Sequence, residues 1–211
     1  RFPSIADTET LDLQPAAHDL VIHALALHWA DDPVGQLIQS RRALAPDGLF
    51  LGVLFGGQTL HELRACLAEA EARLRGALSS RVLPMGELRD LGALLQRAGL
   101  ALPVADSQKV TATYATPRAL LHDLRAIGET NAMASRGAPL TQDILNATEA
   151  LYSDRFAAPD GRVSATFELI FLSGWAPAQS QPKPLRPGSA AARLADALGA
   201  IEQPLSRDKD D

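Results

Sequence analysis

The sequence has 211 residues, of which 46% are hydrophobic and 21% charged, with a formal net charge of −5. This balance is typical of a globular domain with a sizeable core, and the negative charge disfavours nucleic-acid binding through a basic surface. A single cysteine excludes an internal disulfide framework, and no apolar run approaches the about 20 residues needed to span a bilayer.

The first unit along the chain is a strand, a helix and a second strand. Two apolar runs, 20–27 and 49–55, flank a segment with helical spacing over 33–44. Asp31 or Asp32 is placed to cap this helix. This order predicts a βαβ unit of a parallel sheet, and the nearly continuous apolar strands indicate that both faces of the sheet are covered.

Ligands of open α/β sheets bind beyond the carboxyl ends of the strands, which here are 23–29 and 55–59. Two histidines, His23 and His28, lie at the first of these ends. They are five residues apart and do not share a face, so the pattern does not predict a metal site. Elsewhere, His61-Glu62 is followed by Ala65 where a zinc-protease helix needs a second histidine, so no metal is predicted.

Helices and strands alternate through the rest of the chain. Apolar residues at three- and four-residue steps predict helices at 59–78, 87–98, 117–127 and 141–156. Alternating residues predict an antiparallel or edge strand at 109–114, and a long strand follows at 163–172. The two helices inserted between these strands, about 117–158, are of the kind that forms a substrate-selecting lid.

Several residues of the first of these helices allow a plain structural interpretation. Thr59 and Glu62 fit a capping box, and this stands beside a catalytic role as an equal alternative. Cys66 lies within the helix, where we expect a small buried residue and not a nucleophile.

The C-terminal part has a different composition. Four prolines between residues 177 and 187 exclude a regular helix or central strand there. We therefore predict an α/β domain over 1–178 and a Pro-rich extension over 179–211, with a short helix at 189–198 and a charged, disordered end.

Several blocks of the sequence carry a resemblance. Residues 19–22, 26–29 and 41–51 are similar to strands four and five of class I S-adenosylmethionine-dependent methyltransferases. More specific blocks resemble a subfamily that includes the mitochondrial complex I assembly factor, an arginine hydroxylase, and bacterial biotin-synthesis-type methyltransferases. These blocks are 55–64, 90–99, 128–131, 160–167, 174–177 and 180–190.

The resemblance implies a Rossmann-like class I methyltransferase sheet, represented by its strands three or four to seven, with inserted lid helices. It implies S-adenosyl-L-methionine as the cofactor, with Asp7 and Thr8 at the adenine and with His23, Ala24 and Leu25 on the methionine side.

The resemblance and the strand positions together imply the acceptor side. His28 is the candidate general base, needed only if the acceptor must lose a proton. Trp29, Gly56 and Gly57 are predicted to shape the floor of the pocket. Glu129 and Asn131, in the interruption between the two lid helices, are predicted to contact the acceptor.

The sequence departs from the family in one respect, because no Gly-x-Gly-x-Gly loop is present in the 211 residues. We therefore expect this chain alone not to be competent for cofactor binding. Two functions follow as alternatives: methyl transfer to an unidentified acceptor, or action on a client protein, as an arginine hydroxylase or a non-enzymatic scaffold. The expected location is the cytoplasm in a bacterium or the mitochondrial matrix in a eukaryote.

The family's first strand, which precedes this loop and lies beside the strand that corresponds to 19–27, is likewise not among the 211 residues. We therefore expect the 19–27 strand at the edge of the sheet. An exposed apolar edge pairs readily with another chain. We predict that the protein hides this edge, either in a symmetric homodimer or by folding residues 1–17 over it.

Overall fold

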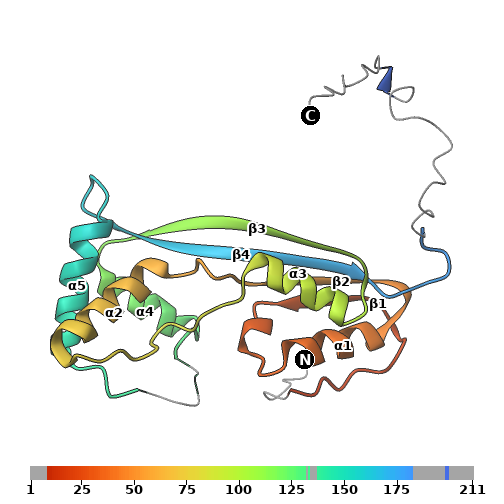
Figure 1. The fold of residues 1–211 in the computed structure, drawn as a ribbon, viewed down its shortest axis with the longest axis horizontal. Coiled ribbons are helices and arrows are strands. Elements are labelled where there is room, and N and C mark those ends of the chain that lie inside the picture. The colour runs from red at the N-terminus through yellow and green to blue at the C-terminus, as the bar shows by residue number, and fades with distance from the viewer. Residues whose placement is uncertain (1–8, 132, 134–136, 183–197, 200–211) are drawn as a thin grey trace, which may run out of the picture. The chain divides into compact units, whose positions relative to one another are not determined.

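The computed structural model describes residues 9–131, 133, 137–182 and 198–199, and it divides into two units, 1–178 and 179–211. All helices and strands named here belong to the first unit (Figure 1). The strands are β1 (His18–Ala24), β2 (Leu44–Phe55), β3 (Ala101–Tyr114) and β4 (Val163–Trp175). The α-helices are α1 (Pro33–Ala43), α2 (His61–Arg75), α3 (Leu88–Arg97), α4 (Pro117–Ala126) and α5 (Gln142–Phe156).

The four strands form one sheet in the order β1-β2-β4-β3. The pair β1 and β2 is parallel, as predicted for the βαβ unit, and β4 pairs antiparallel with both β2 and β3. The mixed α/β class is therefore confirmed. The predicted helix at 189–198 and the adenine residues Asp7 and Thr8 lie outside the described residues, apart from Leu198.

Several strand boundaries differ from the prediction, and backbone geometry explains two of them. The strand β1 ends at Ala24 because Leu25 has a φ of 49°, after which Leu27–Trp29 forms a 3-10 turn. The strand β3 begins at Ala101, eight residues earlier than predicted. Its register shifts between Ala101 and Val104, around Pro103, which is where an edge strand tolerates a proline.

One predicted helix cap is confirmed, and another is wrong. The carboxylate of Asp32 accepts a hydrogen bond from the Gly35 N–H at 2.8 Å, which caps α1 as predicted. The capping box at α2 is not formed, because Leu60 occupies the cap position with a φ of 54° and no side chain caps it. Glu62 accepts instead from the Thr166 N–H at 3.2 Å, and so joins α2 to β4.

Helices α1 and α3 cover one face of the sheet (Figure 1). Their apolar side chains pack with those of β2 and β4 in a cluster that we name the sheet core. Its buried members are Leu27, Leu37, Leu44, Phe50, Leu54, Leu91, Leu95, Ala98, Leu100, Ile170, Leu172 and Ala176.

Helices α2, α4 and α5 pack together at the end of the long β3–β4 pair where β4 begins (Figure 1). They form a second cluster, the lid core, against Val163 and Ala165 of β4. Its remaining buried members are Leu60, Leu63, Cys66, Leu67, Ala70, Leu120, Leu124, Ile144, Leu151 and Tyr152. The predicted lid helices thus exist, and α2 completes their packing.

The opposite face of the sheet is not covered by any described residue, contrary to the expectation that both faces are buried. Leu20, Ile22 and Val104 there are 48%, 65% and 58% exposed. Within the described part, β1 pairs with β2 alone. The stretch 9–17 does not fold over the β1 edge, because its main chain bonds along α1, with Gln39, Arg42 and Ala43 as partners.

Candidate functional site

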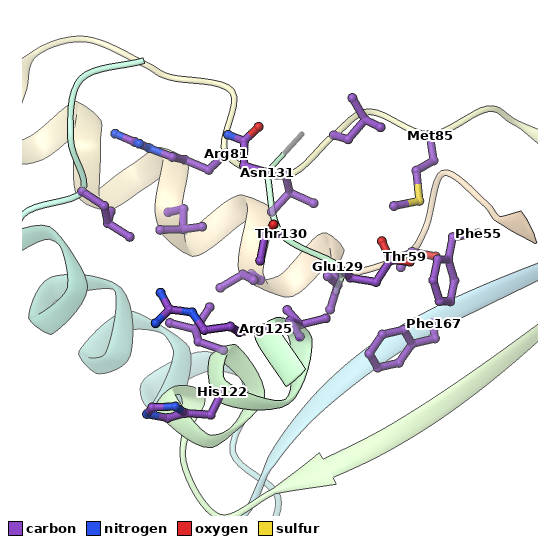
Figure 2. Close-up of a pocket in the computed structure, with 18 of the residues that line it drawn as sticks. Phe55, Thr59, Arg81, Met85, His122, Arg125, Glu129, Thr130, Asn131 and Phe167 are labelled. Atoms are coloured by element: carbon purple, nitrogen blue, oxygen red, sulfur yellow. The ribbon is translucent and has the colours of Figure 1, made fainter. Parts of the chain in front are cut away.

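A cavity of about 870 Å³ lies where the carboxyl ends of β1 and β2 meet the lid helices. Its volume is in the range of small-molecule sites. Figure 2 shows Phe55, Phe167, Thr59, Glu129 and Met85 gathered at one end of it. Aliphatic residues form much of the rest: Leu60, Leu63, Leu67, Val82, Leu83, Leu121, Leu124, Leu140 and Leu145.

Four predicted site residues line this cavity together: His28, Trp29, Glu129 and Asn131. The 3-10 turn after β1 holds the first two, and the loop after α4 supplies the others, about one hundred residues later. The Glu129 Oε1 atom lies 3.3 Å from His28 Nε2 and 3.3 Å from Trp29 Nε1. The structure therefore brings the predicted base and the predicted acceptor-side acid into one cluster.

The hydrogen bonds of this cluster define the histidine tautomer. A carboxylate only accepts, so His28 Nε2–H and Trp29 Nε1–H both donate to Glu129. A neutral His28 then carries its lone pair on Nδ1. That nitrogen is buried and has no hydrogen-bond partner among the described residues. It is the imidazole nitrogen that can take up a proton.

Burial sets the protonation state of His28. The side chain is 4% exposed, and this desolvation lowers the pKa of His28 below its ordinary value of 6.5. Glu129 opposes the shift through its charge and hydrogen bond, while the nearby His23 adds to it. The imidazole is therefore neutral at pH 7, which is the form a general base requires.

Aromatic rings surround the cluster. The ring of Phe55 lies edge-on to His28 with centroids 5.1 Å apart, and Phe167 continues the wall 5.9 Å from Phe55. The ring centroids of Trp29 and His28 lie 6.0 Å apart. Sequence reasoning included Phe55 in the strand end where a ligand was expected, but it did not identify Phe167, which lies in an apolar run typical of a core.

The two glycines predicted for the pocket floor are not among the residues that line the cavity. An added Cβ at Gly56 would lie 2.6 Å from Ile170 Cδ1, and one at Gly57 would lie 2.3 Å from Glu87 Oε1. Neither glycine has a positive φ. Close packing of the protein on itself therefore explains both glycines, and their contact with a substrate stays a prediction.

Buried polar groups position the loop between β2 and α2. The Glu168 carboxylate accepts from the Gln58 N–H at 2.9 Å, and its main-chain N–H donates to Thr59 Oγ1 at 3.0 Å. The Arg64 guanidinium donates to the carbonyls of Gly57 and Thr59. Thr59, which lines the cavity, is thus held from β4 and from α2.

The residues predicted for the methionine side of the cofactor lie at the end of β1, outside the cavity lining. His23 Nε2 lies 2.9 Å from Gln36 Oε1, and its Nδ1 is buried without a partner among the described residues. Leu25 is 44% exposed and has a left-handed backbone. Strained backbone and an unpaired buried nitrogen cluster at ligand sites, so this strand end fits a bound cofactor.

One helix face was missed by sequence reasoning. Arg118, His122 and Arg125 lie at steps of four and three along α4 and line the cavity (Figure 2 labels the last two). The helical spacing was the available signal. Arg118 is already paired with Glu149, Nε to Oε1 at 2.7 Å.

Other chemistry considered from the sequence has no support in this part of the chain. Cys66 is fully buried, and burial raises the pKa of its thiol to about 11, which makes it a poor nucleophile. The described residues contain no group of three or more histidine, cysteine or acidic side chains that could hold a metal ion. Within the same residues, every helix is too short or too polar to span a bilayer.

The sequence of the chain was compared with family models and with known proteins. No protein-family model matches the chain. It is 37% identical over 192 residues to the zebrafish (Danio rerio) protein "Arginine-hydroxylase NDUFAF5, mitochondrial", covering 91% of this chain and 60% of that protein. It is 38% identical over 191 residues to "Malonyl-[acyl-carrier protein] O-methyltransferase" of Laribacter hongkongensis, covering 89% and 62%. The chain thus spans about three fifths of the length of these relatives.

The solved structures show the same fold. A putative methyltransferase from Bacillus halodurans superposes with a TM-score of 0.50 at 16% identity, covering 82% of this chain and 76% of that one. The fold of the sheet and the homologues of the chain therefore confirm the resemblance to methyltransferases that the sequence showed. The chain is a homologue of the NDUFAF5 arginine hydroxylases and of the malonyl-[acyl-carrier protein] O-methyltransferases, with the Rossmann-like fold of class I methyltransferases.

Proposed function

We propose that this chain carries the acceptor side of an S-adenosylmethionine-dependent methyltransferase. The observation that carries the proposal is the buried His28 with its free Nδ1, held by Glu129 at the wall of the cavity. Methyltransferase homologues and the methyltransferase fold support the same class of reaction.

The residues of this chain have distinct roles in the proposal. When bound, S-adenosylmethionine supplies an electrophilic methyl group, and His23, Ala24 and Leu25, with Asp7 and Thr8, would hold it. The neutral His28 takes the acceptor proton at Nδ1, and Glu129 holds the imidazole through Nε2–H. Phe55, Phe167 and the leucines exclude water and position the acceptor, which is the main requirement of methyl transfer.

Cofactor binding is tested by thermal denaturation of the 211-residue chain with and without S-adenosylmethionine. A ligand that binds only the native state adds about 2.7 kcal/mol at a concentration one hundred times its Kd. Because the glycine loop is absent, we expect a much smaller shift in this chain than in a homologue that carries the loop. A full shift would contradict the expectation that the chain alone is not competent for binding.

The role of His28 is tested in a form that does bind cofactor. His28→Asn should lower methyl transfer by about 10²–10⁴-fold with cofactor affinity unchanged, as expected for loss of a general base. His61→Asn is the matched control, since His61 lies outside the cavity lining. Equal activity of the two variants would remove His28 from the mechanism.

A second candidate function is action on a client protein, either as an arginine hydroxylase or as a non-enzymatic scaffold. The arrangement that favours it is the Glu129 carboxylate beside Trp29 and the rings of Phe55 and Phe167, since an acid among aromatic rings suits a guanidinium. Mass spectrometry of modified acceptors separates the alternatives. Methylation adds a CH₂ unit, hydroxylation adds one oxygen atom, and a scaffold adds nothing.

The cellular location that we propose depends on whether the source is a eukaryote or a bacterium. The zebrafish, human and mouse relatives are named as mitochondrial proteins. We expect the mitochondrial matrix for a eukaryotic source and the cytoplasm for a bacterial one.

A further inference from the structure

The charged side chains that line the cavity are unevenly distributed. Near the ends of β1 and β2, the Glu129 carboxylate is bound to the neutral ring of His28, and its negative charge has no arginine or lysine counter-ion among the described residues. Along the α4 wall, His122 and Arg125 line the same cavity. Figure 2 shows these two side chains on the side away from Phe55. The cavity therefore has a negative end and a positive end.

Of the arginines that line the cavity, Arg125 alone has no acceptor for its guanidinium among the described residues. The other two are already paired. Arg118 donates to Glu149, Nε to Oε1 at 2.7 Å, and Arg81 donates to the buried Glu71, Nε to Oε1 at 3.1 Å. A guanidinium presents its N–H donors as a fork that matches two oxygen atoms of a carboxylate or phosphate. Arg125 is therefore the cation of this wall that is available to a ligand.

Apolar side chains line the cavity beside this arginine. Leu121 and Leu124 come from α4, and Leu63 and Leu67 come from α2. A ligand that fills this space therefore needs an apolar stretch as well as a charged group. Burial of the apolar stretch supplies affinity, whereas the unlike charges of the two ends determine the direction in which the ligand lies.

We propose that the acceptor of this site is an amphiphile whose anionic head group is bound by Arg125 at the α4 wall. This inference rests on the proposed function, because it names the class of acceptor that the cavity takes. The Glu129 carboxylate repels the anion from the opposite end, since like charges placed together are unfavourable. The reacting group of the acceptor, which is remote from its anionic head group, therefore lies next to His28.

Isothermal titration calorimetry of the 211-residue chain with octanoate, octyl phosphate and 1-octanol tests this assignment. The probes share one hydrocarbon chain and differ in the head group. An anionic probe should bind about tenfold more tightly than 1-octanol, because hydrogen bonds between charged groups are stronger than those between neutral groups. The tighter of the two anions identifies the head group. Arg125→Gln should remove the preference for an anion, and Arg125→Glu should transfer it to octylammonium.

Arg97→Gln is the matched control, since Arg97 is an exposed arginine at the end of α3 and lies outside the cavity lining. This variant should keep the preference for an anion. Three results would each overturn the proposal: no preference for an anion over 1-octanol, a preference that survives Arg125→Gln, or no binding of any probe. The titration needs neither cofactor nor methyl transfer. Its failure is therefore distinguishable from a failure of the proposed function, which His28→Asn tests.

Discussion

The sheet core and the lid core are built by different means. The sheet core is apolar and lies on one face of the sheet between α1, α3, β2 and β4. The lid core has a comparable apolar interior, but buried acids tie its margins to the rest of the chain. Glu71 is fully buried and holds Arg81 and the Ser79 N–H, and Glu62 binds Thr166.

This difference indicates how each region is specified. Apolar packing tolerates changes of side chain when the total volume is kept. A buried carboxylate requires its own partners, since a lone buried charge is strongly unfavourable. The lid is therefore held in one place above the cavity by a few polar contacts, while the sheet supplies a rigid base for His28.

Breaking the polar contacts of the lid should have the largest effect. Glu71→Ala removes the carboxylate that accepts from the Arg81 guanidinium and from the Ser79 N–H, and should lower the free energy of unfolding by about 3–5 kcal/mol. Urea denaturation measures it. Glu69→Ala removes a partly exposed carboxylate that pairs with Arg73 and Arg155, and it should change stability little. A small effect at Glu71 would show that the lid does not depend on it.

The same carboxylate makes stability depend on pH. Burial acts to raise the pKa of Glu71, but the hydrogen bonds from Arg81 and Ser79 outweigh it, so the pKa lies below its ordinary value of 4.5. A lowered pKa in the folded state contributes stability above pH 4.5 that is lost as the pH falls through the folded pKa. Glu71→Gln should therefore flatten the acid limb of the stability curve.

The two neighbouring glycines allow a finer comparison. Gly56→Ala places a Cβ against Ile170, which is fully buried in the sheet core, and should cost about 1–3 kcal/mol of overpacking. Gly57→Ala meets Glu87, an exposed side chain that can move away, and should cost clearly less. Thermal denaturation of both variants measures the difference. Equal losses would contradict this reading of the two positions.

The smallest effect is expected at the junction of the two regions. In a form that binds cofactor, the acid limb of the pH profile of kcat/KM should lie below pH 6.5, because burial lowers the pKa of His28. Glu129 raises that pKa, so Glu129→Gln should move the limb to still lower pH and reduce turnover, with cofactor affinity almost unchanged. A limb that moves upward, or not at all, would separate Glu129 from His28.

Local patterns predicted most elements of the molecule. The Asp32 cap, the βαβ unit and the lid helices follow from short-range spacing, which depends on neighbours in the chain. The strand boundaries that were predicted wrongly depend on backbone conformations. The spacing of apolar residues does not reveal these conformations, such as the positive φ of Leu25 and of Leu102.

For the site, too, local sequence predicted some features and only the tertiary structure decided others. The sequence by itself determined that His28 follows an apolar strand and that Glu129 lies in the interruption between two helices. Only the tertiary structure decided that these two side chains meet, and that Glu62 binds β4 instead of capping its own helix. Contacts between residues one hundred positions apart depend on how the sheet and the lid pack, and hydrophobic periodicity carries no information about the partner of a polar side chain.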